Sequence, residues 1–213
     1  MPSTPFTPFT SPYAVLPRDN IDTDQIIPAR FLKTTERSGL GPLAFYDWRT
    51  APDGTPDPDF VLERPGARDA KVLVAGRNFG CGSSREHAVW ALQGAGFRAI
   101  VSTEFADIFR GNALGNGLLP IQVDAGTVEQ LVHAARNGDA PRVTVDLESQ
   151  TLTLPTGTVA WFPVPPFAKH CLLHGIDELE FLLGARDAVD DYEARHPARV
   201  NTLAARPRPA VVS

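Results

Sequence analysis

The chain has 213 residues, of which 43% are hydrophobic and 21% charged, the composition of a globular protein with one domain or at most two. A formal net charge of -5 and the absence of a Lys/Arg block argue against nucleic-acid binding. The N-terminal stretch lacks the pattern of a signal peptide, and no apolar run approaches a membrane span, so we expect a cytoplasmic protein.

The two ends of the chain have the composition of flexible segments. Residues 1–12 are rich in Thr, Pro and Phe and predict an irregular arm, flexible over residues 1–11. Residues 198–213 have the character of a frayed tail. We expect one compact domain between them, so that residues 1–213 form a single domain with two loose ends.

The first half of the body combines a short strand with a long connection. The letters NIDTD (residues 20–24) predict a strand that would place the carboxylates of Asp22 and Asp24 on one side. The segment Gly39–Asp59 carries four prolines and several turn-forming residues. It is therefore expected to be a long ordered connection rather than part of a sheet.

From Lys71 onward, strands and helices alternate with short connections. The expected strands are 71–76, 98–102 and 118–123, and the expected helices are 84–94, 104–114 and 127–137. Residues 142–154 (RVTVDLESQTLTL) predict a hairpin, and the chain is helical again from Pro165. The pattern predicts a mixed α/β fold with a parallel βαβ core and functional loops at the carboxyl ends of the parallel strands.

The first of these loops, GRNFGCGSSREHA (residues 76–88), concentrates the reactive side chains. It lacks the spacing of a dinucleotide fingerprint, the lysine of a phosphate-binding loop and the G-x-S-x-G of a hydrolase. Ser83 and Glu86 have the spacing of a capping box, which is worth about 1 kcal/mol. Arg85 in a first helical turn opposes the helix dipole. It therefore predicts a bound anion, such as a substrate carboxylate gripped bidentately.

Two other groups have metal-ligand spacing, but neither predicts a metal. Asp22 and Asp24 have no third ligand beside them. His170 and His174 fit the last turns of a helix that ends at Gly175, where cations are favourable. The chain has two cysteines, Cys81 and Cys171, too few for a disulfide framework or for an iron–sulfur cluster held by this chain alone.

Two long motifs in the same order resemble the swivel domain of the aconitase family. They are NIDTDQIIPARFL (Asn20–Leu32) and GRNFGCGSSREHA, supported by FYDWR, TEFADIFRGN, NGLLP and YEARHPA. The resemblance covers the chain from about Pro12 to Ala198. It implies a swivelling β/β/α domain that closes an active site with its serine loop.

The resemblance also implies the chemistry and its partners. Members of the family remove water from a 2-hydroxy acid and add it back on the neighbouring carbon. The similarity favours 2-isopropylmalate of leucine biosynthesis, with homoaconitase or a citraconate/methylmalate hydratase as the alternatives. The [4Fe–4S] cluster is expected on a large subunit, in a heterodimer or heterotetramer, and no cofactor on this chain. A stand-alone serine hydrolase and a non-catalytic binding module are the less favoured classes.

Within the serine loop, the resemblance implies a role for each polar residue. Ser83 is the general base, Ser84 donates a hydrogen bond to a substrate carboxylate, and Arg85 binds that carboxylate. Glu86 and His87 are assigned structural and orienting roles. The glycines of the loop, Gly80 and Gly82, are structural as well.

The NIDTDQIIPARFL motif and the residues after it supply the remaining expected site residues. Asp24 is expected to orient an active-site arginine through an ion pair, and Thr23 to supply a hydroxyl. The resemblance places residues 30–37 near the part of the substrate that differs between relatives. Phe31 and Leu32 could form an apolar wall there, whereas Lys33 or Arg30 could bind an additional carboxylate, so the sequence alone leaves the substrate open.

Overall fold

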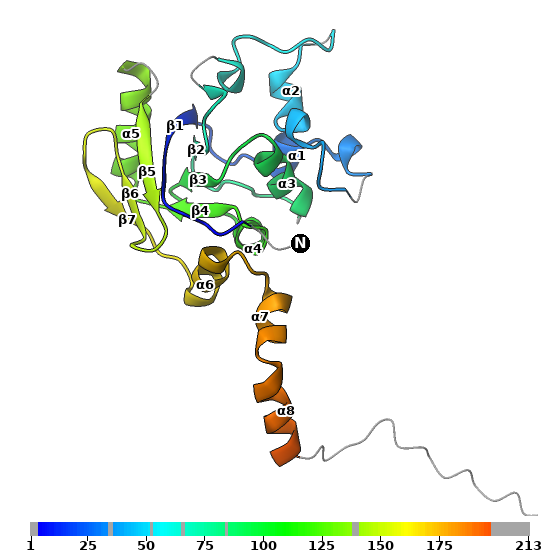
Figure 1. Cartoon of the computed structure of the whole chain (residues 1–213). Helices are drawn as coiled ribbons and strands as arrows, with labels where there is room; N and C mark the ends of the chain where they lie inside the picture. The colour runs from blue at the N-terminus through cyan, green and yellow to red at the C-terminus, as the bar shows by residue number, and fades with distance from the viewer. Residues whose placement is uncertain are drawn as a thin grey trace, which may run out of the picture. The chain divides into compact units, whose positions relative to one another are not determined.

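Figure 1 shows the computed structural model, which describes residues 4–33, 36–51, 53–64, 67–83, 85–137 and 141–196. The chain divides into two units, residues 1–177 and residues 178–213. The first unit contains the sheet and all the expected site residues. The predicted tail (residues 198–213) lies outside the described residues.

The first unit is built on one seven-stranded mixed sheet with the order β4-β3-β2-β1-β5-β6-β7. The strands are β1 (Phe9–Leu16), β2 (Val72–Ala75), β3 (Ala99–Ser102), β4 (Leu119–Gln122), β5 (Arg142–Asp146), β6 (Thr151–Thr153) and β7 (Val159–Trp161). Strands β1 to β4 are parallel, and β5 to β7 continue the sheet antiparallel. Strand β1 joins the two halves, because residues 9–12 pair with β5 and residues 13–16 with β2.

The predicted alternation of strands and helices is confirmed, with helix starts shifted by two or three residues. The helices are α1 (Thr23–Ile26), α2 (Tyr46–Arg49), α3 (Glu86–Gly94), α4 (Asp107–Gly115), α5 (Ala125–Asn137) and α6 (Pro166–His174), with 3-10 turns η1 (Ala29–Phe31), η2 (Gly41–Leu43) and η3 (Val61–Glu63). The predicted end of α6 is also confirmed, since Gly175 takes the left-handed conformation with φ 66°. The segment Gly39–Asp59 contributes no strand, as expected.

Each face of the sheet covers its own hydrophobic core. Successive side chains of a strand point to opposite faces, so Leu73 packs in one core and its neighbours Val72 and Val74 pack in the other. Helices α3 and α4 contribute to the first core, and α5, α6 and the β5–β6 hairpin contribute to the second. The sheet is therefore a rigid platform between two apolar layers, and its strand ends have fixed positions.

The predicted irregular arm is wrong for residues 9–12, which form the first half of β1. Strand β5 supplies its partner from more than a hundred residues away. The segment before β1 is also anchored, because Phe6 is buried and the guanidinium carbon of Arg98 lies 4.7 Å from the Phe6 ring centre and 4.3 Å from that of Phe9. The composition rich in Thr and Pro gave no sign that Phe6 is buried and that Phe9 is half-buried.

The second unit contains α7 (Glu178–Gly184) and α8 (Arg186–Arg195). Helix α8 carries two ion pairs, each between residues one helical turn apart. They join Arg186 to Asp190 at 3.9 Å and Arg195 to Asp191 at 3.6 Å. In the part of the chain that the structure describes, no helix has the length and apolar character needed to cross a membrane.

Candidate active site

Three loops meet at the carboxyl edge of the parallel strands, and the serine loop that follows β2 lies between the other two. On one side it pairs with the segment after β1, where Gly80 N donates to Ile21 O at 2.8 Å and Thr23 N donates to Cys81 O at 2.9 Å. On the other side, Phe79 N donates to Glu104 O at 3.0 Å. The parallel ladder thus continues past the strands, and both neighbours hold the loop in place.

Gly80 is required by the backbone and by the space around it. Its φ is +77°, a conformation that costs about 1–2 kcal/mol for a residue with a side chain. A Cβ atom there would lie 2.2 Å from Cγ of Phe109, a side chain that is packed in the core. Gly82 also has a positive φ of +89°, but a Cβ there would meet nothing closer than 3.4 Å. The two glycines therefore differ in how much a substitution should cost.

We expect Gly80→Ala to destabilise the chain by about 2–4 kcal/mol, the sum of backbone strain and overpacking against Phe109. Gly82→Ala is the matched control and should cost only the backbone term of about 1–2 kcal/mol. Urea unfolding followed by circular dichroism would measure both. Equal losses for the two variants would show that Phe109 moves aside without cost.

The predicted capping box formed by Ser83 and Glu86 is wrong. Helix α3 begins only at Glu86, and its N-cap residue is Arg85, whose side chain makes no capping hydrogen bond. The Glu86 carboxylate instead accepts a hydrogen bond from Asn116 Nδ2 at 3.2 Å. Ser83 is exposed, and its hydroxyl makes no hydrogen bond to another described residue. Capping the helix therefore does not account for this serine.

The ion pair expected for Asp24 is present, and its partner is Arg85. One guanidinium nitrogen of Arg85 bonds Asp24 Oδ1. The Arg85 side chain is 19% exposed and that of Asp24 is 53% exposed, so the aspartate supports the arginine from the solvent side. Arg85 is also the N-cap residue rather than part of the first helical turn as predicted. A guanidinium has five donors in a fixed plane, so further donors remain for a carboxylate.

Thr23 fixes the position of the serine. Its buried side chain donates from Oγ1 to the backbone carbonyl of Ser83 at 2.9 Å. Ser84, which follows, lies outside the described residues. The hydroxyl of Thr23 therefore acts on the loop backbone and leaves the Ser83 side chain accessible.

The predicted strand at NIDTD is wrong, because residues 23–26 form the one-turn helix α1. Asp22 is its N-cap: Oδ1 accepts from Gln25 N at 2.8 Å, while Gln25 Oε1 accepts from Asp22 N at 3.0 Å. The short acidic residue three positions before a glutamine was the signal for this capping box. The carboxylates of Asp22 and Asp24 therefore have separate structural roles.

Residues 30–37 begin with an ion pair that the sequence did not predict. The resemblance places these residues near the variable part of the substrate. Both terminal nitrogens of Arg30 bond the Asp47 carboxylate, which holds the pKa of Asp47 below its usual range. The Arg30 guanidinium carbon also lies 4.7 Å from the Phe31 ring centre. Phe31 and Leu32 pack partly against the first core, whereas Lys33 is exposed. The charge of Arg30 is therefore balanced locally, whereas no described residue forms an ion pair with Lys33.

Two further side chains of the serine loop have identifiable environments. Burial and the nearby Asp22 raise the pKa of the Cys81 thiol, which disfavours the thiolate. The His87 ring centre lies 4.8 Å from the ring centre of Trp90. Neither feature suggests a nucleophile at these positions.

Sequence reasoning missed two asparagines that shape the edge of the site. Asn20 and Asn78 both adopt positive φ, 55° and 57°, and Asn78 Nδ2 donates to Asn20 Oδ1 at 2.9 Å. Asparagine is enriched in this backbone conformation, so the two polar residues just after β1 and β2 were an available signal. Arg77 adds an ion pair with Glu104 at 3.2 Å across the next loop.

The residues of this chain do not fit an iron–sulfur cluster. Cys81 lies in the serine loop and Cys171 is buried in α6, and a cluster of this type takes several thiolates at one place. Among the residues that the structure describes, no three His, Cys, Asp or Glu side chains are grouped to hold a metal. No step of the chemistry is therefore assigned to a metal held here.

Comparison with known families and structures agrees with this arrangement. The family model described as the aconitase C-terminal domain matches residues 8–126, and one described as LeuD_N matches residues 129–166. With a mixed sheet that presents a serine and an arginine at its carboxyl edge, the chain is a swivel domain of the aconitase type.

Individual proteins with a more specific name match most of the length of the chain. The 3-isopropylmalate dehydratase small subunit of Roseiflexus castenholzii is 57% identical over 200 residues, covering 94% of this chain and 98% of that protein. That of Anaeromyxobacter dehalogenans strain 2CP-C is 60% identical over 174 residues, covering 82% and 88%. A 3-isopropylmalate dehydratase structure from Methanocaldococcus jannaschii matches with a TM-score of 0.62 and 26% identity, covering 88% of this chain and 99% of that one. The chain belongs to the family of 3-isopropylmalate dehydratase small subunits.

Proposed function

We propose that this chain is the small subunit of the hydro-lyase that interconverts 2-isopropylmalate and 3-isopropylmalate through 2-isopropylmaleate, in leucine biosynthesis. The observation that carries the proposal is the exposed Ser83 hydroxyl, free of any helix cap, two residues from the Arg85–Asp24 ion pair. The names of relatives that match nearly the whole chain support the same assignment.

The site residues divide the work between proton transfer and carboxylate binding. Ser83 takes the proton next to a substrate carboxylate and returns one in the rehydration step. Arg85 binds that carboxylate and stabilises the negative charge that develops on it. Ser84 donates a second hydrogen bond to the same group. Asp24 orients the arginine, so that its free donors face the substrate.

The reaction requires a partner, because this chain does not fit the cluster that its family uses. A [4Fe–4S] cluster held by the large subunit would supply the Lewis-acid chemistry at the leaving hydroxyl. The small subunit closes over the substrate with its serine loop, in a heterodimer or heterotetramer. The assembly works in the cytoplasm on a small dicarboxylate, with neither nucleic acid nor membrane as a partner.

The segment after α1 supports isopropylmalate over substrates that carry an extra carboxylate. Arg30 is neutralised by Asp47, which removes one of the two cations available for a third carboxylate. Phe31 and Leu32 then supply an apolar wall for the isopropyl group, worth about 1–3 kcal/mol per methylene in discrimination. Homoaconitate, which carries a third carboxylate, remains the alternative if Lys33 faces the substrate.

The test is reconstitution with the large subunit of a close relative. The isolated chain should be inactive, and the reconstituted pair should turn over 3-isopropylmalate with kcat/KM at least about tenfold above that for homoaconitate or citraconate. Turnover by the isolated chain after metal stripping would contradict the two-subunit assignment. A tenfold preference for a tricarboxylate would show that Lys33, rather than Phe31 and Leu32, faces the substrate. Hydrolysis of generic esters by the isolated chain would instead indicate a stand-alone serine hydrolase.

A further inference from the structure

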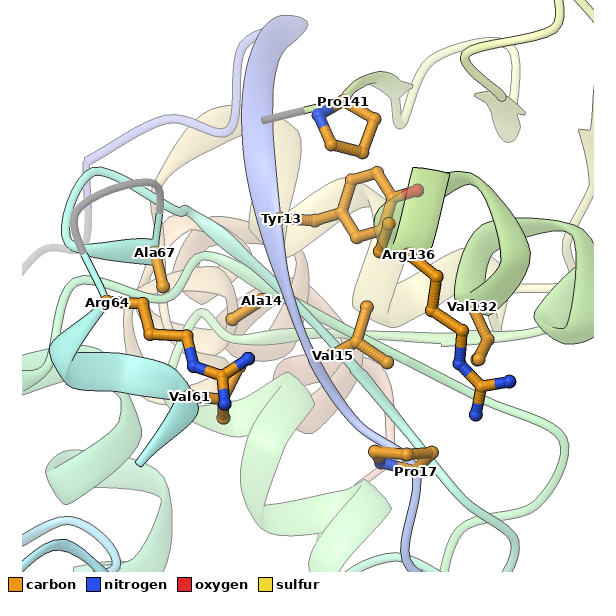
Figure 2. A pocket seen from close by; sticks show the side chains of 11 residues that line it. Tyr13, Ala14, Val15, Pro17, Val61, Arg64, Ala67, Val132, Arg136 and Pro141 are labelled. Carbon is orange, nitrogen blue, oxygen red and sulfur yellow. The ribbon is translucent and has the colours of Figure 1, made fainter. Parts of the chain in front are cut away.

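A groove lies along the open edge of β1, outside the candidate active site (Figure 2). Strand β1 pairs with β5 only through residues 9–12, and with β2 through residues 13–16. Among the described residues, one edge of the segment 13–16 therefore has no strand partner. The groove at this edge has a volume of about 270 Å³.

The walls of the groove come from both faces of the sheet. Tyr13 and Val15 point to the side covered by α5, where Val132 faces them, while Ala14 points to the opposite side, toward Val61 of η3 (Figure 2). The Tyr13 hydroxyl is itself used, since it donates to Leu131 O at 2.8 Å. The floor is therefore apolar and fixed by the two cores.

Two arginines provide the charge of this groove. Arg64 follows η3, and Arg136 lies in the last turn of α5. Both side chains are exposed, and Figure 2 shows their guanidinium groups on either side of the β1 ribbon. Arg64 also donates to the carbonyl of Asp59 at 3.1 Å. No acidic side chain lines the groove among the residues that the structure describes. An apolar channel with cations at its rim is complementary to an aliphatic anion.

We propose that this groove binds an aliphatic monocarboxylate. The carboxylate pairs with the guanidinium groups of Arg136 and Arg64, and the alkyl chain lies against Val15, Val132 and Val61. At ~30 Å³ for each water-sized group, the volume takes at most roughly nine non-hydrogen atoms, which corresponds to an acid of up to six or seven carbons. Among the described residues, the groove offers no anion for an ammonium group, so we expect the acid without an amino group to bind more tightly than the amino acid.

The experiment uses the full chain and 4-methylpentanoate as the probe, with binding measured by calorimetry or by NMR titration. We expect saturable binding with a Kd of about 1 mM or tighter, and at least about tenfold weaker binding of the neutral 4-methylpentanamide and of leucine. Arg136→Gln and Arg64→Gln should each weaken binding by about fivefold or more, and the double variant should abolish it. Both arginines are exposed, so these changes leave the core intact.

Arg85→Gln is the matched control, because Arg85 is the other carboxylate-binding candidate of the chain. It should leave binding of 4-methylpentanoate unchanged. Three results would overturn the proposal: no saturable binding at ~10 mM probe, equal affinity for acid and amide, or loss of binding in the Arg85 variant alone. Since the measurement needs no large subunit and no turnover, its failure is distinguishable from a failure of the proposed function.

Discussion

Ser83→Ala in the reconstituted complex is expected to lower kcat by about 10²–10⁴-fold while the two subunits still assemble. The hydroxyl makes no hydrogen bond to another described residue, and α3 begins three residues later without it. If Ser83 is the proposed proton acceptor, its removal takes away that group and little of the structure. The free energy of unfolding should change by less than the ~1 kcal/mol that loss of a helix cap would cost.

Steady-state kinetics on the complex and urea unfolding of the isolated chain separate these effects. Ser149→Ala is a suitable control, because this serine lies in the turn between β5 and β6, away from the serine loop, and is bonded to Thr151. Turnover of Ser83→Ala within twofold of the unmodified complex would remove this serine from the chemistry. A large loss of stability without a loss of kcat would restore a capping role.

The parallel core could be predicted from the sequence because each of its elements is specified locally. The residues of β2 to β4 are short apolar runs bounded by turn signals, and their buried positions on both faces explain the absence of alternation. The hairpin of β5 and β6 has the alternating pattern of a strand pair with one face in the core. The location of the site followed from the rule that loops at the carboxyl ends of parallel strands lie together.

What the sequence did not predict depends on partners distant in the chain. The strand in residues 9–12 forms because β5 lies beside it, and the local composition does not predict that pairing. The neutralisation of Arg30 depends on Asp47, 17 residues away, so Arg30 appeared to be a free cation. At NIDTD the local signal was present but misread, since the capping box of Asp22 and Gln25 competes with the strand pattern and prevails.

The ion pair between Asp24 and Arg85 gives the second large expected effect. Arg85→Lys should raise KM by about 10–100-fold with a smaller change in kcat, because a point charge cannot replace the planar fork that holds Asp24 and a carboxylate together. Asp24→Asn keeps the size of the side chain and removes the charge that orients the guanidinium. Its effect should also fall mainly on KM, and Asp24→Glu should recover part of it.

A double-mutant cycle with both changes tests whether the two residues act as one unit. If Asp24 acts only through Arg85, the double variant Asp24→Asn/Arg85→Lys should be hardly worse than Arg85→Lys alone, so the two free-energy losses are not additive. Additive losses would show that Asp24 contacts the substrate or the large subunit directly. Glu104→Gln is the matched control, because it breaks the neighbouring ion pair with Arg77 on the other side of the serine loop. It should leave KM nearly unchanged, since that pair is exposed and holds no group next to Ser83.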